Sequence, residues 1–484
     1  KEIIYTMTKY KSIISEKTKN TTKEQLSLYN QVETKESLRG KAINSQTISL
    51  RDKLINTIPS TTYLTHGIHN FYPAKFIPQV PRYIIEKYRL KGKVILDPFA
   101  GSGTTAVESI ITGNSNISSD INPMTPFLIN VKLLKLDTSK EMKYFGVISR
   151  HAEAIFSSEK EFSPRWSNVD YWYPPEILPI IKQMWAYIHS IDENTESEIK
   201  TILKAAGLFI SRKYSFSDDE TPKLTRSKFK NARMEKLVDS LNNQGRIIFK
   251  NELKVKAIEY LNSCLEINNL YKLNFSKTSK LDNVTRPFLY VTTKSLNHLP
   301  STIQSNTIDC IVTSPPYLYA QEYFRSTKID LYWLDLLSDR QVKDLTKNEI
   351  GQKKISFSGI DDHIANIQSY KSVLERIVEL SVNFKTQDNI QRFTSYFADM
   401  QFFIRFAADV LKIDGILSIF IGEPKVFGCP INVKDIITEM MINCGFKIEE
   451  ALFDIIKNRN LSKNRLNENP EGIVGEWLIV GRKL

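Results

Sequence analysis

The sequence has few of the residues that disulfide frameworks and metal clusters require. Only four cysteines occur among 484 residues, and none belongs to a Cys-x-x-Cys pair. We therefore expect neither a disulfide framework nor a metal site, and so few thiols are typical of a reducing compartment. No run of about 18 apolar residues is present, so no transmembrane helix is predicted.

Sorting signals and common phosphate-binding signatures are missing too. The first residues lack the apolar core of a signal peptide, which favours a cytoplasmic location. Because the chain begins with Lys1 rather than Met, we expect the native N-terminus to lie upstream. The glycine-rich stretch DPFAGSGTT (Asp97–Thr105) has neither the G-x-G-x-x-G of a dinucleotide site nor the Gly-Lys-Ser/Thr of a P-loop, so phosphate cradling is not supported.

The charge balance favours a polyanionic partner. The formal net charge is +12 and the sequence pI is near 9.2. A basic excess of this size is common in nucleic-acid-binding proteins, although many other soluble proteins share it. The apolar fraction of 41% is enough for a sizeable core, and the length suggests two to four domains or one large domain with insertions.

Strand and helix patterns alternate in two regions of the chain. KVILD (93–97) reads as a buried strand, a glycine-rich turn follows, and an amphipathic helix ends at Gly113. A second strand ending at Asp120 precedes another helix, and the pattern resumes at 288–293, 308–313 and 475–483. Such βα units predict an α/β fold with a doubly wound sheet.

The composition divides the chain into four parts. Residues 1–60 predict a helical N-terminal arm, 61–136 the first part of an α/β domain, 137–285 a large, mainly helical insert, and 286–484 the second part of the α/β domain. Within the last part, residues 338–390 read as a polar insertion.

The stretch TSPPY (Thr313–Tyr317) ends a predicted buried strand with two prolines. Proline has a fixed φ and no N–H donor, so the turn should be stiff. In open α/β sheets, ligands bind beyond the carboxyl ends of the strands. The stretch is thus either a rigid binding corner or a simple strand terminator.

Two aspartates follow predicted strands. Asp97 could meet the ammonium group of a ligand, and Asp120 stands where acidic residues commonly bind ribose hydroxyls. Either could instead cap a turn or a helix.

DPFAGSGTT and TSPPY together resemble the S-adenosylmethionine-binding and catalytic motifs of amino-methylating DNA methyltransferases. These enzymes alkylate the N4 amine of cytosine or the N6 amine of adenine. HNFYPAKF (His69–Phe76) and the stretch from YFADM to IFIGEP (396–424) resemble flanking segments of the family. The resemblance covers most of residues 60–135 and 285–484, and implies a Rossmann-like S-adenosylmethionine-dependent methyltransferase fold. It also implies a double-stranded DNA substrate, a nucleoid-associated protein of prokaryotic type, and a possible cognate restriction endonuclease.

The resemblance also assigns residues by position. The catalytic residues would be Ser314, Pro315, Pro316 and Tyr317. The cofactor-binding residues would be Tyr72, Ala74, Lys75, Phe76, Asp97, Phe99, Ala100, Gly101, Ser102, Gly103, Thr104, Asp120 and Thr313. The chain departs from many relatives at VTTKS (291–295), where Gly-Asp would place an aspartate against the adenine ring.

Serine at the first position of Ser-Pro-Pro-Tyr resembles the N4-cytosine enzymes, whereas Asp or Asn there resembles the N6-adenine enzymes. N4-cytosine methylation is therefore favoured, with N6-adenine methylation as the alternative. An RNA base methyltransferase and an inactive cofactor- or DNA-binding regulator also stay open.

The helical insert is the candidate target-recognition region. Cations with interleaved aromatic residues suit phosphate and base contacts, although they could be a solvated surface run. The residues concerned are Arg212, Lys213, Tyr214, Lys223, Arg226, Lys228, Lys230 and Arg233. YWYPPE (Tyr171–Glu176) could stack on bases, but core packing is favoured.

Overall fold

The computed structural model describes most of the chain. The described residues are 50, 54, 62–69, 72, 75–218, 224–227, 234, 238, 244–276, 289–293, 296–318, 323–350, 364, 366–379, 385–426, 429–456, 473 and 475–484. The predicted N-terminal arm lies outside them, apart from Leu50 and Leu54, which are buried.

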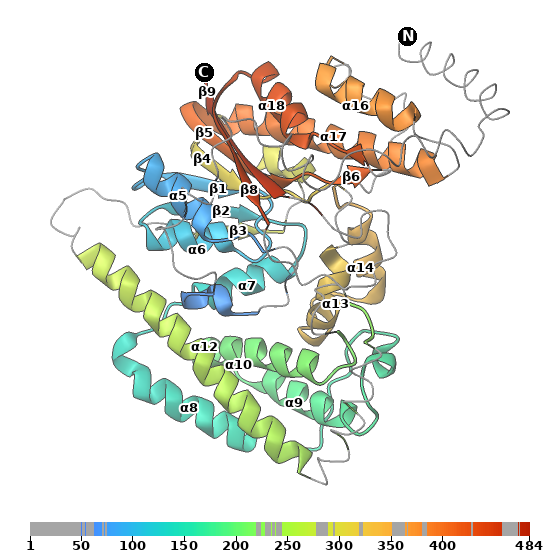
Figure 1. Cartoon of the computed structure of the whole chain (residues 1–484). Helices are drawn as coiled ribbons and strands as arrows, with labels where there is room; N and C mark the ends of the chain where they lie inside the picture. The colour runs from blue at the N-terminus through green and yellow to red at the C-terminus, as the bar shows by residue number, and fades with distance from the viewer. Residues whose placement is uncertain are drawn as a thin grey trace.

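A seven-stranded sheet forms the centre of the described part of the protein, in the order β3-β2-β1-β4-β5-β9-β8 (Figure 1). Its strands are β1 (Val94–Asp97), β2 (Ser115–Ser119), β3 (Leu289–Thr292), β4 (Ile308–Thr313), β5 (Leu411–Gly422), β8 (Phe446–Ile455) and β9 (Gly475–Lys483). Strands β1 to β5 run parallel, and β9 is antiparallel to both of its neighbours. This arrangement confirms the predicted α/β, Rossmann-like sheet.

Alternating side chains of the strands supply two separate cores. On β1, Ile95 packs against α5 (Gln79–Lys87), whereas its neighbour Leu96 packs on the side of α17 (Lys385–Val410) and α18 (Val433–Asn443). Strand β4 repeats the pattern, with Cys310 and Val312 on the first side and Ile311 on the second. Helices therefore cover both faces, as the short apolar strands predict.

The order of strands reverses between β1 and β4. From β1 the chain builds outward through β2 and β3, and then returns to add β4 and β5 on the other side of β1. Pairing of Ile95 with Cys310 and of Asp97 with Ser118 brings the carboxyl ends of β1, β2 and β4 to one edge. That edge is the switch point at which open α/β sheets bind ligands.

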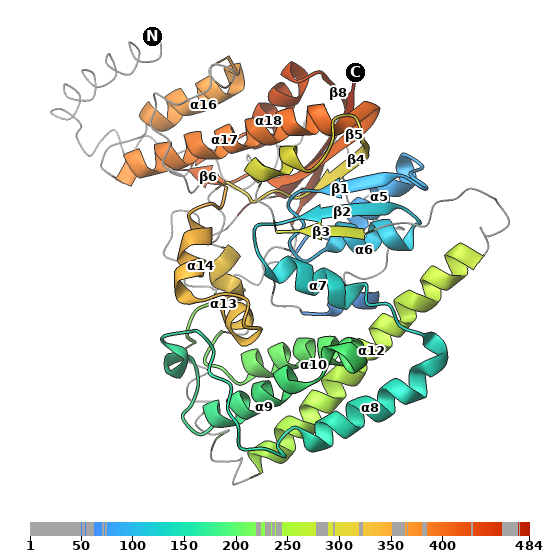
Figure 2. The ribbon, with the colours of Figure 1, turned by 180° about the vertical axis from the view of Figure 1, so that it is seen from behind.

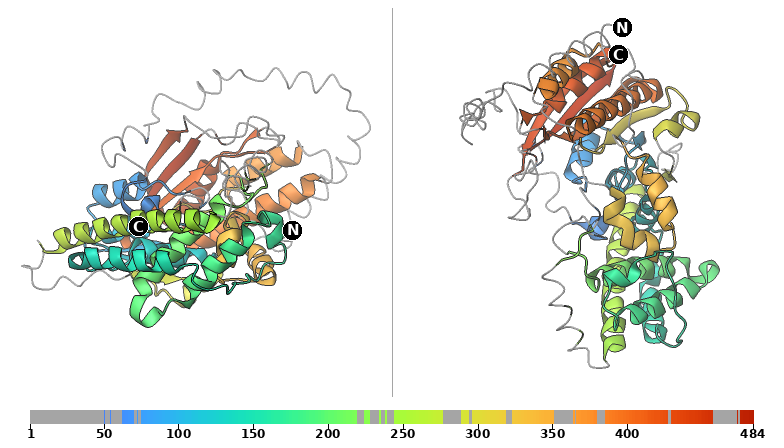
Figure 3. Two further views of the ribbon diagram at one scale, coloured as in Figure 1. Left: turned by 90° about the horizontal axis from the view of Figure 1, so that it is seen from below. Right: turned by 90° about the vertical axis from the view of Figure 1, so that its right-hand side faces the viewer.

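A layer of long helices lies below the β3 side of the sheet in Figures 1 and 2. It contains α8 (Glu141–Ala154), α9 (Leu178–Ser190), α10 (Glu193–Lys213) and α12 (Gly245–Ser276), with α8 alongside α12 (Figure 3). The layer shares one apolar core with α7 (Met124–Lys132) and α13 (Tyr323–Trp333). Trp333 of α13 stacks on Trp185 of α9, with ring centroids 6.1 Å apart.

In the C-terminal half, one expectation needs correction and one strand was not predicted. The stretch 338–390 is not merely a polar insertion, because it forms α14 (Asp339–Thr346) and α16 (Gln368–Glu379) and buries Ile377 and Tyr370 in the core beside α17. Strand β8 was not anticipated, since its exposed edge carries the charged residues of FKIEE. The four-part domain division stays a prediction.

Membrane spans and metal clusters were also sought in the described residues. None of the helices there is long and apolar enough to cross a membrane. Nor do those residues place three His, Cys, Asp or Glu side chains together as a candidate metal site.

Candidate functional site

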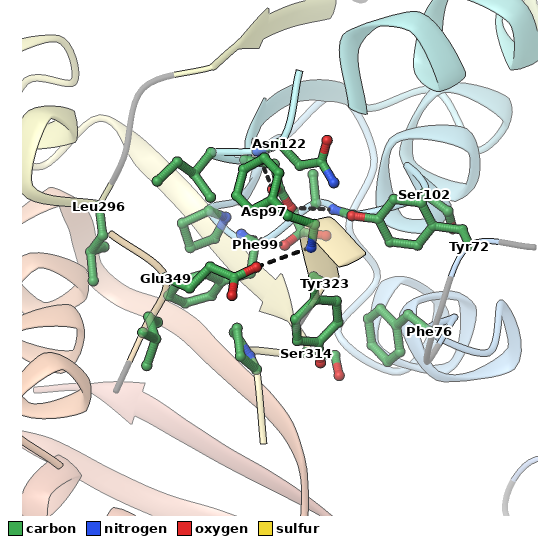
Figure 4. Close-up of a pocket in the computed structure, with 18 of the residues that line it drawn as sticks. Tyr72, Phe76, Asp97, Phe99, Ser102, Asn122, Leu296, Ser314, Tyr323 and Glu349 are labelled. Carbon is green, nitrogen blue, oxygen red and sulfur yellow. Dashed lines mark hydrogen bonds between the residues drawn. The ribbon is translucent and has the colours of Figure 1, made fainter. Parts of the chain in front are cut away.

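A pocket opens at the carboxyl edge of the sheet, where the ends of β1, β2 and β4 meet (Figure 4). It contains about 890 Å³ of space not filled by protein atoms, part of which is open to solvent. Many of the predicted site residues line it, although they come from segments more than 200 residues apart. They are Tyr72, Lys75, Phe76, Asp97, Phe99, Ala100, Gly101, Ser102, Asp120, Ser314 and Pro316.

The glycine-rich turn allows two close approaches. Gly101 has φ +48°, and a Cβ atom there would lie 3.1 Å from Cε1 of Tyr72. Gly103 has φ +79°, and its Cβ would lie 2.4 Å from Cγ1 of Ile129, so this glycine serves helix packing rather than the pocket wall. Thr104, also predicted to bind the cofactor, is buried as the first residue of α6 (Thr104–Ile111) and does not line the pocket.

Asp97 ties the ends of β1 and β4 together. Its Oδ1 accepts hydrogen bonds from the hydroxyl of Thr313 at 2.6 Å and from the backbone N–H of Phe99 at 3.2 Å. Burial raises the pKa of Asp97 to about 6. Thr313 is fully buried and reaches the site only through this carboxylate.

Asp120 holds the glycine-rich turn. Oδ2 accepts the N–H of Gly101 and Oδ1 the N–H of Asn122, each at 2.8 Å. Burial raises the pKa of this carboxyl, too, to about 6. The capping role considered for Asp120 is therefore present, and the same carboxylate faces the pocket.

The opposite wall carries a cation. Nζ of Lys75 lies 3.4 Å from the carbonyl oxygen of His66, to which it donates, and burial lowers the pKa of Lys75 to about 8. Tyr72 and Phe76, which lie on one side of the pocket in Figure 4, line it together with Lys75. The pocket thus pairs carboxylates with one lysine. Ala74 lies outside the described residues.

The turn at Pro315 and Pro316, here called the proline corner, is held by a hydrogen bond from α17. The Tyr396 hydroxyl donates to the carbonyl of Pro316 at 3.0 Å. Ser314 and Pro316 line the pocket, whereas Pro315 is buried. Tyr317 does not line the pocket. Its hydroxyl donates to Oε1 of Glu476 at 2.7 Å.

Several lining residues were missed by the sequence reasoning. Tyr323 and Phe324 come from α13, and Glu349 comes from the segment after α14. Oε1 of Glu349 accepts the N–H of Phe324 at 3.1 Å (Figure 4). No spacing links these residues to the glycine-rich turn, so only the fold could bring them together. The other missed lining residues are Pro98, Ile121, Asn122, Leu296, Asn348 and Ile350.

All the predicted DNA-contacting residues except Arg226 fall into three groups. Arg212 and Tyr214 are buried, at 0% and 2% exposure, and Nη1 of Arg212 donates to the Ser326 carbonyl at 2.8 Å. The expectation that these two contact DNA is therefore corrected: Arg212 joins α10 to α13, and Tyr214 packs on Phe249 of α12 with ring centroids 4.2 Å apart. Lys213 is partly exposed and pairs with Glu252 at 2.6 Å. Lys223, Lys228, Lys230 and Arg233 lie outside the described residues.

Arg226 is held between two aromatic rings. Its guanidinium lies 4.6 Å from the ring centroid of Tyr171 and 4.1 Å from that of Phe216. Tyr171 is 52% exposed, whereas Tyr173 is buried and its hydroxyl accepts the indole N–H of Trp333 at 2.7 Å. YWYPPE thus combines core packing with one exposed ring.

Comparison with known proteins gives one family and several relatives. A family model described as DNA methylase matches residues 1–125. Type II methyltransferase M.MvaI of Kocuria varians is 27% identical over 303 residues, which cover 59% of this chain and 60% of that protein. M.BsoBI of Geobacillus stearothermophilus is 25% identical over 346 residues, 64% of this chain and 62% of that protein. M.AvaI of Nostoc is 24% identical over 399 residues, 79% of each chain.

Proposed function

Because the chain belongs to the amino-methylating DNA methyltransferases, we propose that it transfers a methyl group from S-adenosylmethionine to an exocyclic amine in double-stranded DNA. The observation that carries the proposal is the shared pocket, which joins Asp97 and Asp120 to Ser314 and Pro316. The chain spans about 60% of the first two relatives' length, so their activity is a proposal for it.

The chemistry of the pocket suits this cofactor. S-adenosylmethionine carries a sulfonium, an ammonium and a carboxylate, and the pocket offers Asp97, Asp120 and Lys75. At Gly101, a side chain would meet the ring of Tyr72, so glycine lets this ring lie against the turn in the pocket wall. Asp120 follows Gly101 by 19 residues, the separation typical of a carboxylate that binds ribose hydroxyls.

The proline corner can orient the target amine. The lone pair of a nucleobase amine is delocalised into the ring, so the amine is a poor nucleophile. We assign the two acceptors of its N–H groups to the hydroxyl of Ser314, which lines the pocket, and to the carbonyl of the buried Pro315 beside it. Together they would direct the lone pair along one line. The bound cofactor supplies an electrophilic methyl group, while the protein supplies the orientation.

The target base must leave the duplex to reach this corner. We assign Tyr317 the role of stacking on the extruded base beside the pocket, which its ring does not line, and its bond to Glu476 would fix the plane of the ring. We place N4 of cytosine first, because serine opens the tetrad, and N6 of adenine second. A cognate restriction endonuclease as partner belongs to the same proposal.

Methyl transfer from tritiated cofactor to duplex DNA, with tRNA as a parallel substrate, tests the function. Nucleoside mass spectrometry of the product DNA should give N4-methylcytosine. N6-methyladenine would select the alternative base, and transfer to tRNA alone would select the RNA enzyme. Cofactor binding without transfer to either nucleic acid would make the protein a binding regulator and end the proposal.

A further inference from the structure

One carboxylate in the pocket has no role in the proposed reaction so far. Glu349 is 8% exposed and belongs to a segment that follows α14, far in sequence from both recognised motifs. Its backbone neighbours Asn348 and Ile350 line the same pocket. Figure 4 shows its side chain between Leu296 and Tyr323, on the far side of the pocket from Tyr72.

Glu349 is held firmly toward the cavity. The N–H of Phe324, the second residue of α13, donates to its Oε1 at 3.1 Å. An N–H at the start of a helix lacks an intrahelical acceptor, so a carboxylate there is favoured by both the hydrogen bond and the helix dipole. A carboxylate has about four acceptor positions, so it can accept a ligand donor in addition to bonds within the protein.

The strand order locates the adenosine part of the cofactor. With Asp120 on the ribose at the end of β2, and Ser314 beyond β4 at the reactive end, the purine extends toward β3. Leu296 follows β3, and Ile121 and Ile350 line the pocket with it. These apolar side chains suit the faces of a flat ring, but they offer nothing to the amine on its edge.

We propose that Glu349 accepts a hydrogen bond from the 6-amino group of the cofactor's adenine ring and so selects adenine over other purines. The inference rests on the proposed function and adds one positioning contact to it. The segment after β3 supplies Leu296 rather than an acidic side chain to the pocket. The acceptor for the amine therefore comes from the other wall.

Competition binding with the cofactor product and its deaminated analogue tests the contact without turnover. S-adenosylhomocysteine presents an amine donor at position 6, whereas S-inosylhomocysteine presents a carbonyl acceptor there. The wild-type protein should bind the adenine form at least about tenfold tighter, because the inosine form opposes two acceptors. In Glu349→Gln the amide can donate to the carbonyl, so the ratio of the two affinities should fall by about tenfold or more.

A third ligand distinguishes the loss of the Glu349 contact from misfolding of the variant. The product analogue with hydrogen at position 6 should bind the wild-type protein more weakly than S-adenosylhomocysteine, and equally with it in Glu349→Ala. The matched control is Glu153→Gln, which removes an exposed carboxylate paired with Lys250 in the helical layer. This control should keep the wild-type ratio.

Two outcomes separate the inference from the function on which it rests. If wild type does not distinguish the three ligands, or if Glu349→Gln keeps the wild-type ratio while losing methyl transfer, Glu349 does not contact adenine. If wild type binds none of the ligands, the proposed function itself fails.

Discussion

The two buried carboxylates and the lysine of the pocket predict a bell-shaped pH dependence of ligand affinity. A carboxyl group with a pKa of about 6, as for Asp97 and Asp120, is roughly one-tenth ionised at pH 5 and roughly nine-tenths ionised at pH 7. If the ammonium of the ligand needs Asp97 in its ionised form, affinity should rise about tenfold between these values. A second ionised carboxylate at Asp120 would steepen the rise.

The upper limb of the profile belongs to Lys75. Its pKa of about 8 means that it is charged at pH 7 and increasingly neutral above pH 8. Because the charged lysine attracts the carboxylate of the ligand, affinity should fall above pH 8. Calorimetry with S-adenosylhomocysteine from pH 5 to 9 measures both limbs, and Lys75→Met should remove only the upper one.

Asp97 and Asp120 also determine how the stability of the free protein changes with pH. Their folded-state pKa lies above the reference value of 3.8, so each stabilises the fold most below about pH 4, and this stabilisation is lost as pH rises through 6. Each accounts for up to about 3 kcal/mol. Urea unfolding at pH 5 and pH 7 measures this difference in the free energy of unfolding.

Ligand affinity that stays flat from pH 5 to 7, without proton release on binding, would refute this account of the pocket.

Three substitutions test separate parts of the molecule. Ser314→Ala should lower methyl transfer by at least about tenfold and leave S-adenosylhomocysteine affinity unchanged, since it removes an acceptor for the target amine alone; equal loss of both would move Ser314 to cofactor binding. Arg212→Met should destabilise the fold by about 3 to 5 kcal/mol in urea unfolding, because it removes the arginine that lies 3.7 Å from the buried carboxylate of Asp330. The control is Arg165→Met in the exposed pair with Asp335, for which a loss of less than about 1 kcal/mol is expected. Arg226→Ala should reduce the slope of log affinity for DNA against log salt by about one, and an unchanged slope would exclude a phosphate contact.

The pocket could be predicted from the sequence wherever a residue follows a strand directly. Asp97 ends the apolar strand β1 and Ser314 follows the apolar strand β4, whereas Asp120 follows the largely polar strand β2. Parallel strands bring these three carboxyl ends to one edge. Glu349 could not be found in this way, because its position depends on how α13 and α14 pack. Tyr317 shows the opposite case: the motif identifies the residue, but the sequence does not predict the direction of its ring.

The buried position of Arg212 shows what a run of cations leaves undecided. The run suggested a surface, but the preceding sequence ILKAAGLFIS (202–211) is apolar nearly all round the helix, and such a helix lies inside a protein. Gly207 lets the side chains of Ile188 and Trp185 approach the backbone, so α10 is enclosed as far as its last turn. An arginine there meets Asp330 rather than solvent. The burial of a cation therefore follows from the helix that carries it, and DNA contacts should be sought beyond the end of α10, from Arg226 onward.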